Sequence, residues 1–439
     1  YKLTGFVQGE KYVLKRNENW YGYTAGLYDG QYQTDRIVCV TCEVWDEALL
    51  KFNKVEIDNL ALPDTAAKDF YTSERIYHTS DNFVNFLNLQ SDEQALKARE
   101  KTGINKTILT YKDFRKAISL GIDRAAYVYS SVADALPGFG LISDSYYYDV
   151  DNGLAYRRSE EAKMALIRAY GVDVSEFGSL DEAVDSITGY DLAQAKALVN
   201  SAYNQAIADG KLKATDTVQL VWGAPADNPT NLNEFLFVSH AMTELMKGTP
   251  LEGKFSMLFD SSYGGALLKD FRNGKFDICS AGWTGEVNDP AGLINAHLDP
   301  EYMYSYAWDT SSQMMTFTMP VKQSDGTTKD TELTMSLLDW CYCLNGIGDC
   351  AYDWSANSVS PEVRLPLIAA LEEQVLLSYY SIPMCYDADA SLISYKTEYI
   401  DDDYNTFLGY GGVRFMTYNY NDGEWDEFVL SQGGYLNYK

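Results

Sequence analysis

The chain has 439 residues, of which 46% are hydrophobic and 22% charged, values typical of a folded globular protein with two or three domains. Its 35 Lys and Arg residues against 63 Asp and Glu residues leave a formal net charge of -28. A field of that sign repels phosphate backbones and anionic lipids, which argues against a nucleic-acid or membrane-surface binder. No run of about 18 apolar residues occurs, so we expect no membrane span in this chain.

The first part of the chain predicts a β-rich region followed by a helix. Residues 11–15 alternate between polar and apolar side chains, and residues 35–44 form a β-branched run, both typical of strands. Residues 46–52 predict a short helix, and residues 83–88 predict another strand. Residues 111–128 repeat apolar side chains at spacings of three and four, which predicts one helix with a buried face.

Two amphipathic helices are predicted next, at 160–170 and 192–208, with Gly171 and Gly210 as stop signals. From residue 216 onward, strand and helix patterns alternate. The predicted succession is strand 217–222, helix 231–247, strand 254–260, helix 264–272 and strand 276–281. A β-α-β-α-β order predicts a sheet with crossover helices, and such sheets bind ligands beyond the carboxyl ends of their strands.

The last third predicts a hairpin, a helix and two more strands. Residues 314–335 form the hairpin around Ser324-Asp325-Gly326, and we interpret it as an insertion. A helix is predicted at 361–377, and strands at 382–386 and 413–420. No repeat or low-complexity linker is present, so we expect interleaved domains.

Cysteine and histidine patterns offer little support for a metal site or an enzyme. Cys341, Cys343 and Cys350 surround a tight-turn sequence, and either a local disulfide or buried free thiols fit this cluster. Only three histidines occur, in separate contexts, so neither a zinc site nor a Ser/His/Asp triad is predicted. We predict no cofactor, no metal and no catalytic residue.

The most informative segment is FDICSAGWTGEVNDP, residues 276–290. A strand ends here, Gly282 opens the backbone, Trp283 offers a flat indole face, and Glu286 follows in a glycine-containing loop. Backbone groups, an aromatic face and one carboxylate suit an extended peptide with a terminal ammonium. The opposite interpretation makes Trp283 a core aromatic and Glu286 a solvated acid.

At this segment the sequence resembles the family 5 extracellular solute-binding proteins, the peptide and oligopeptide receptors of bacterial ABC importers. In that family, a segment of the form FD-x-x-x-x-GW followed by an acid and proline closes the third strand of the ligand-binding lobe. Other segments resemble the family in the same order. They are YKLTGFVQGEKYVLKRNENWYG (1–22), DEALLKFNKVEID (46–58), NFLNL (85–89), YKDFRKAISLGIDRAAYV (111–128) and LEEQVLLSYYSIPMCYDADASLIS (371–394).

The resemblance implies an α/β fold, with a periplasmic-binding-protein-like type II lobe built on a mixed sheet flanked by helices and a β-rich partial second lobe. We expect partial lobe one at 1–80 and 409–439, and lobe two at 81–408 with the hairpin inserted at about 314–335. Family members carry a further N-terminal part with a signal or lipobox segment, so the resemblance also implies an N-terminally truncated chain.

The resemblance also implies site residues. In oligopeptide-binding members, an aspartate three positions after the motif tryptophan pairs with the peptide's amino terminus, and the flanking main chain pairs with its backbone. The matching residues here are Gly282, Trp283, Thr284 and Glu286. Positions that bind the peptide carboxylate through basic residues in some members are Ser280 and Asn233 here, which departs from the family pattern.

The leading hypothesis is a monomeric, non-enzymatic receptor that captures a short peptide and delivers it to the permease subunits of an ABC importer. It would act outside the cell, as a surface lipoprotein or in the periplasm. An oligosaccharide receptor of the same family is the second hypothesis, because 35 tyrosines and 8 tryptophans offer stacking faces. A secreted hydrolase and a surface adhesin are hypotheses from two different functional classes.

Overall fold

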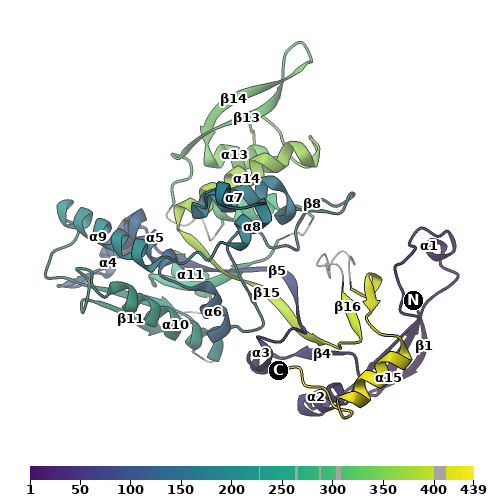
Figure 1. Ribbon diagram of the computed structural model, residues 1–439. Coiled ribbons are helices and arrows are strands. Elements are labelled where there is room, and N and C mark those ends of the chain that lie inside the picture. The colour runs from purple at the N-terminus through teal and green to yellow at the C-terminus, as the bar shows by residue number, and fades with distance from the viewer. Residues whose placement is uncertain (227, 263–264, 286–287, 303–307, 400–411) are drawn as a thin grey trace. The chain divides into compact units, whose positions relative to one another are not determined.

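The computed structural model describes the whole chain except residues 227, 263–264, 286–287, 303–307 and 400–411 (Figure 1). Internal contacts divide it into two units. Unit 1 comprises Tyr1–Ser80, Ala133–Ala135 and Ala388–Lys439, and unit 2 comprises Asp81–Val132 and Leu136–Asp387. The contacts assign Ala388 onward to unit 1, whereas the predicted lobe boundary lies at 408/409. The assignment of the units to lobes one and two stays a prediction.

Unit 1 is a β-rich unit with a small aromatic core. Its strands are β1 (Lys2–Val7), β2 (Lys11–Lys15), β3 (Arg36–Val40), β4 (Asn59–Leu62), β16 (Thr397–Tyr399) and β17 (Met416–Tyr418). Its helices are α1 (Tyr21–Thr24), α2 (Trp45–Asn53), α3 (Asp64–Phe70) and α15 (Asp422–Ser431), with the 3-10 helix η4 (Gly412–Arg414). Phe52, Trp425 and Tyr438 are buried in its core. Strands β1, β2 and β3 form an antiparallel sheet.

Two strands of unit 1 are shorter than the sequence predicts. β3 ends at Val40 because that residue pairs with Lys11, the first residue of β2, so no partner strand continues past it. β17 covers only Met416–Tyr418, because its partner β16 is equally short and residues Gly412–Arg414 form a 3-10 turn. Both predictions correctly placed a strand but overestimated its length.

Unit 2 contains the mixed sheet. Its strands are β5 (Ile76–Leu89), β6 (Ile104–Asn105), β7 (Leu136–Pro137), β8 (Tyr147–Asp149), β9 (Leu154–Ala155), β10 (Thr217–Gly223), β11 (Phe255–Asp260), β12 (Ile278–Trp283), β13 (Met314–Lys322), β14 (Thr328–Ser336) and β15 (Ser381–Ile393). The sheet order is β11-β10-β12-β5-β15, continued by β4, and β5 and β15 both cross the boundary between the units. β10 is parallel to β11 and β12, whereas β5 is antiparallel to β12. The predicted α/β class with a mixed sheet is confirmed.

The helices predicted at 160–170, 192–208, 231–247, 264–272 and 361–377 are present in unit 2 with nearly those bounds, together with further helices that the sequence did not indicate. The helices of unit 2 are α4 (Glu93–Arg99), α5 (Lys112–Leu120), α6 (Arg124–Ser131), α7 (Glu160–Tyr170), α8 (Leu180–Asp185), α9 (Leu192–Ala208), α10 (Pro229–Met246), α11 (Leu267–Arg272), α12 (Ala291–Leu298), α13 (Leu337–Asn345) and α14 (Pro361–Ser378), with 3-10 helices η1 (Thr107–Thr110), η2 (Tyr156–Arg158) and η3 (Val174–Glu176). The predicted single helix at 111–128 is wrong. α5 ends at Gly121, and Asp123 begins α6 by accepting a hydrogen bond from the Ala126 amide (3.1 Å), so two helices replace one.

The predicted hairpin is confirmed. β13 and β14 pair from Met314↔Ser336 to Lys322↔Thr328, and Gly326 in the turn has a φ of 84°. Met315 and Met319 on its inner face are buried against the core of unit 2, whereas the outer face is exposed. The hairpin extends beyond α13 and α14 at the top of Figure 1.

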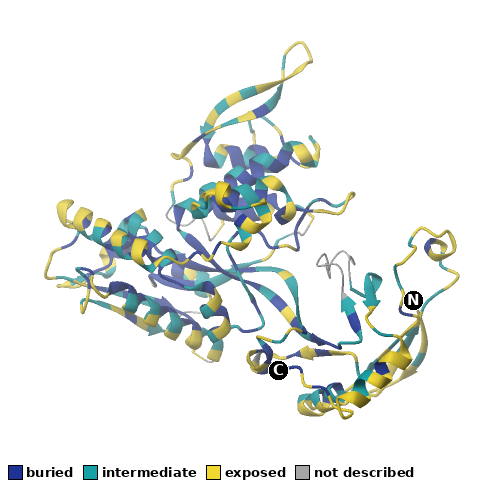
Figure 2. Cartoon of the chain, viewed as in Figure 1, coloured by how far each residue is buried: buried dark blue, intermediate teal, exposed yellow. Residues whose placement is uncertain are grey.

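The core of unit 2 includes buried residues of α12, α13 and α14, and the ribbon around α13 and α14 has long dark blue stretches in Figure 2. Buried charges are also present in this core. Glu372 on α14 is 0% exposed and accepts hydrogen bonds from the Tyr156 hydroxyl (2.7 Å) and from the Arg157 guanidinium (2.5 and 3.2 Å). Because Arg157 is also buried, each charge depends on the other for its stability in the core.

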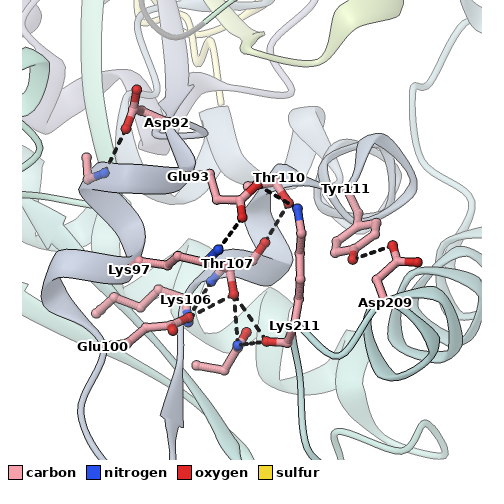
Figure 3. A network of polar contacts seen from close by, with 12 residues as sticks. Asp92, Glu93, Lys97, Glu100, Lys106, Thr107, Thr110, Tyr111, Asp209 and Lys211 are labelled. Atoms are coloured by element: carbon pink, nitrogen blue, oxygen red, sulfur yellow. Dashed lines mark hydrogen bonds and ion pairs between the residues drawn. The ribbon is translucent and has the colours of Figure 1, made fainter.

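A polar network at β6 and η1 fixes a second buried cation (Figure 3). The Glu100 carboxylate accepts hydrogen bonds from the amides of Lys106 and Thr107 and from the Thr107 hydroxyl, at 2.8 to 2.9 Å. Lys106 itself is only 4% exposed. The network therefore holds the backbone of Lys106 so that its ammonium reaches into the unit.

Candidate functional site

The candidate site lies at the carboxyl end of β12. β12 pairs with β5 along its whole length, from Ile278↔Leu89 to Trp283↔Val84. Its parallel pairing with β10 covers only Ile278 and Cys279, because β10 ends at Gly223. Residues 280–283 therefore continue past the end of β10, their parallel neighbour. They lie at the carboxyl ends of the strands, where α/β proteins bind ligands.

Asp277 fixes the start of this strand. Its carboxylate is 0% exposed and accepts hydrogen bonds from the Lys106 ammonium (2.6 Å) and from the Val221 amide (2.7 Å). Its other oxygen lies 2.6 Å from Arg99 Nη2, an ion pair without the alignment of a hydrogen bond. Two cations and one amide thus compensate a buried carboxylate and tie β12 to β10.

Gly282 has a packing role that the sequence did not indicate. A Cβ atom at this position would lie 2.1 Å from Phe83 Cε1 and 2.8 Å from the Val84 carbonyl oxygen. The ring of Phe83 on β5 therefore occupies the space that any side chain at residue 282 would need. The predicted contact of this backbone with a ligand stays a prediction.

Trp283 ends the strand half-buried. Its indole packs partly against the core of unit 2 and meets the Tyr302 ring edge-to-face, with centroids 5.9 Å apart and planes at 79°. Tyr302 is 37% exposed. Both interpretations of Trp283 thus have support, because one part of the ring packs inside and another part borders an exposed aromatic side chain.

The loop after β12 is held by Tyr146 and Asn82. The Gly285 amide donates to the Tyr146 hydroxyl oxygen (2.7 Å), which in turn donates to the Asn82 carbonyl (2.8 Å). The Asn82 side chain donates to the Gly285 carbonyl (3.1 Å), and Thr284 also hydrogen-bonds Tyr146. Burial raises the pKa of Tyr146 to about 12, so its hydroxyl stays protonated. Glu286 lies outside the described residues.

Glu234 on α10 is a buried acid next to Ser280 that sequence reasoning missed. It is 5% exposed, accepts a hydrogen bond from the Tyr127 hydroxyl (2.7 Å) and hydrogen-bonds Ser280. Burial raises the pKa of its carboxyl group, although both hydroxyls act in the opposite direction. Among the described residues, no Lys or Arg forms an ion pair with it. A usable signal was its place in the buried stripe of α10, with Val238 and Met242 at spacings of four.

The sequence matches the model of the bacterial extracellular solute-binding proteins, family 5 Middle, over residues 1–305, a range that includes β12 and its flanking segments. The chain belongs to family 5 of these solute-binding proteins. No curated protein matches the sequence.

Three solved structures have a similar fold. The unliganded open form of MppA, a periplasmic murein tripeptide binding protein, matches with a TM-score of 0.57 and 12% identity over 95% of this chain and 62% of that chain. HbpA2 from Haemophilus parasuis matches with a TM-score of 0.55 and 11% identity over 95% and 63% of the two chains. A putative peptide binding protein AppA from Clostridium difficile gives a TM-score of 0.52 and 11% identity over 95% and 67%.

These likenesses show a common fold. Together with the family match, they confirm the predicted periplasmic-binding-protein-like type II class. The chain spans less than two thirds of the MppA and HbpA2 chains that it matches. Within the described ranges, no helix is long and apolar enough to cross a membrane. In the same ranges, no group of three or more His, Cys, Asp or Glu side chains could hold a metal ion.

For this family 5 protein, the structure brings only some of the predicted site residues together. Ser280, Gly282, Trp283 and Thr284 follow one another along β12 and the start of its loop. Asn233 has an exposed side chain on α10, and among the described contacts it does not meet Ser280. The ligand roles of all of these residues stay predictions.

Proposed function

We propose that this family 5 protein is a receptor that captures short peptides outside the cell and delivers them to the permease of an ABC importer. The observation that carries the proposal is the continuation of β12 past β10 within the family-matched range. A strand end of this kind suits main-chain pairing with an extended peptide. Two proteins that share its fold are a murein tripeptide binding protein and a putative peptide binding protein, which supports the same ligand class.

In this proposal, Trp283 forms an aromatic wall of the site and Glu286 pairs with the peptide's terminal ammonium. Ser280 and Asn233 stand where basic residues would bind a peptide carboxylate, so the carboxyl end of the ligand receives no strong anchor. We therefore expect the amino terminus to dominate recognition. The protein would act as a monomer on the extracellular side, and it would release its ligand unchanged.

Calorimetric titration of the full chain with peptides tests this proposal. Peptides of two to five residues are used with free and with acetylated amino termini. We expect stoichiometric binding of free-amine peptides, with affinity at least about tenfold lower for acetylated ones, because a lost charge-assisted hydrogen bond costs about 1.5 kcal/mol or more. The Glu286→Gln variant should bind both forms equally.

The matched control is Glu332→Gln on the exposed outer face of the hairpin. It removes the same charge elsewhere, so it should keep the preference for free amines. If Glu286→Gln also keeps that preference, the anchor role is wrong. If the full chain binds no peptide, the peptide proposal itself is wrong, and hydrolysed peptide in the titration cell would support the hydrolase hypothesis.

A pocket in unit 1 favours an oligosaccharide as the second candidate ligand. It has a volume of about 310 Å³ and is lined by Tyr1, Arg16, Asn17, Trp20, Tyr23 and Tyr32. Trp20 also stacks on Tyr28 with ring centroids 5.2 Å apart. Aromatic faces beside an amide and a guanidinium suit a sugar ring. Titration with glycans should separate the candidates, because Trp20→Ala would weaken glycan binding and Trp283→Ala would weaken peptide binding.

A further inference from the structure

The segment after α13 folds back onto that helix. α13 ends at Gly346, whose φ of 65° is left-handed, and the amides of Gly346 and Ile347 both donate to the Tyr342 carbonyl. Gly348 is also left-handed, with a φ of 68°. The Trp354 amide then donates to the Cys343 carbonyl (2.9 Å), so the returning chain is hydrogen-bonded to the helix at the position of a cysteine.

This reversal brings two thiols together. Cys343 is 1% exposed and belongs to the core of unit 2, and the half-buried Cys350 packs against that core. The Cys350 thiol donates a hydrogen bond to the Ile347 carbonyl at the tip of the turn, and it lies close enough to Cys343 to add to the effect of burial, which raises the pKa of the Cys343 thiol. Both carry free thiols in this structure.

Cys341 is not part of this pair. Its sulfur lies 3.4 Å from Asn295 Oδ1 and 3.7 Å from Asn345 Nδ2, so it faces another side of α13. The sequence left three cysteines as candidates for a local disulfide, and the geometry separates one of them from the other two.

We propose that Cys343 and Cys350 are a disulfide-forming pair that closes when the protein meets an oxidising extracellular environment. The family places this chain outside the cell, where disulfides persist. Two S–H bonds break and one S–S bond forms, while a disulfide-bearing oxidant such as oxidised glutathione takes up the two electrons and leaves as two thiols.

The thiol that is more exposed to the oxidant should react first. Cys350 is half-buried and the one that an oxidant can reach, so its thiolate attacks first and forms a mixed disulfide. Burial raises the pKa of Cys343 to about 11, which makes it a poor first nucleophile. Because it already touches Cys350, it can resolve the mixed disulfide after losing its proton to water.

The bond would secure an aromatic segment against α13. Trp354 stacks on Tyr352 and on Trp340, with ring centroids 5.0 and 5.6 Å apart. Tyr352 and Trp354 follow Cys350 on the returning chain, whereas Trp340 lies on α13. Closing the eight-residue loop from Cys343 to Cys350 should raise the melting temperature by roughly 5 °C.

Mass spectrometry of the full chain tests the proposal without any ligand, so its result is independent of the proposed function. The purified protein is incubated with oxidised glutathione, alkylated in denaturant with N-ethylmaleimide, and digested without reduction. No Lys or Arg lies between Cys341 and Cys350, so trypsin leaves all three cysteines on one peptide. We expect this peptide to carry one N-ethylmaleimide group, located on Cys341 by fragmentation, and to be two hydrogen masses lighter than the same singly alkylated peptide with two free thiols.

Two variants give matched controls. Cys341→Ser should keep the cross-link and the melting temperature difference between oxidised and reduced protein. Cys350→Ser should lose the cross-link and the melting temperature difference. If that variant does not fold, wild-type protein reduced with dithiothreitol is compared with oxidised wild-type protein instead. Full alkylation of Cys343 and Cys350 after oxidation, or a cross-link that contains Cys341, would overturn the assignment.

Discussion

Replacing Asp277 with Asn tests whether buried charges hold the site strand. The side chains are nearly the same size, so packing is kept while the negative charge is lost. Lys106, 4% exposed, would then keep only uncharged acceptors, the Gln219 carbonyl (2.6 Å) and the amide oxygen of the new side chain. Arg99, whose side chain is 19% exposed, can turn to water. The main cost is therefore an uncompensated charge at Lys106.

Removing one partner of a buried ion pair costs about 3–5 kcal/mol of folding free energy. We expect Asp277→Asn to lie in this range and to open β12 locally. Adding Lys106→Met should recover at least about 2 kcal/mol, because a neutral side chain of similar length removes the buried charge. Asp330→Asn, on the exposed face of β14, is the matched control and should change stability by less than about 0.5 kcal/mol.

Urea unfolding gives the total change, and hydrogen exchange of peptides covering residues 276–283 places it on the strand. A loss below about 1 kcal/mol for Asp277→Asn would show that the two cations do not depend on this carboxylate. Failure of Lys106→Met to recover stability would show that the cost comes from lost hydrogen bonds to the backbone instead.

Three further predictions concern packing and buried charge. Gly282→Ala should cost about 1–3 kcal/mol in urea unfolding, because the added Cβ clashes with the Phe83 ring and with the Val84 carbonyl oxygen. Adding Phe83→Ala should recover only part of the lost hydrogen-exchange protection of β12, since the backbone contact remains. Burial lowers the pKa of His297 to about 3, below its unfolded value of about 6.5, so unfolding takes up a proton between these values. Stability contributed by this residue should therefore be complete above pH 6.5 and fall by about 1.4 kcal/mol per pH unit on acidification, a slope that His297→Gln should lack. Glu372→Gln should cost about 3–5 kcal/mol, because the buried arginine beside it loses its counter-charge, whereas Glu373→Gln at the partly exposed ion pair next to it should cost less than about 1 kcal/mol.

Local signals explain the parts of the fold that could be predicted. α7 and α9 have the predicted bounds, because Ser159 caps the first and Asp191 caps the second, and Gly171 ends the first in a left-handed conformation. The alternation from β10 to β12 was visible as apolar runs separated by helical spacing. The full length of β5 was not, since its first residues, from Ile76, are only partly buried and carry no strong strand pattern.

The strand that carries the candidate site was predicted in nearly the right place, but the contacts that hold it were not predicted. The motif of residues 276–290 located the strand end, and Trp283 lies there. Asp277 belongs to the FD-x-x-x-x-GW motif, but its role as a buried counter-ion was not predicted, because its partners Lys106 and Arg99 are far away in the sequence. Non-local ion pairs of this kind leave no periodic signal. Glu234 did leave one, as a charged residue in an apolar stripe, and a search for such residues would have found it.

In the proposed function, the contacts that hold β12 would set the affinity for a ligand, whereas the net charge would set the rate at which the ligand approaches. Asp277 holds the start of the strand, Phe83 packs on its end, and Tyr146 holds the loop that follows, so the backbone is rigid before a ligand arrives. A rigid edge lowers the ordering cost of binding. The net charge of -28 acts differently, since salt screens it beyond about 8 Å at physiological ionic strength. In the proposed function, it would speed the approach of cationic peptides at low salt, while the groups around β12 would decide which of them stay bound.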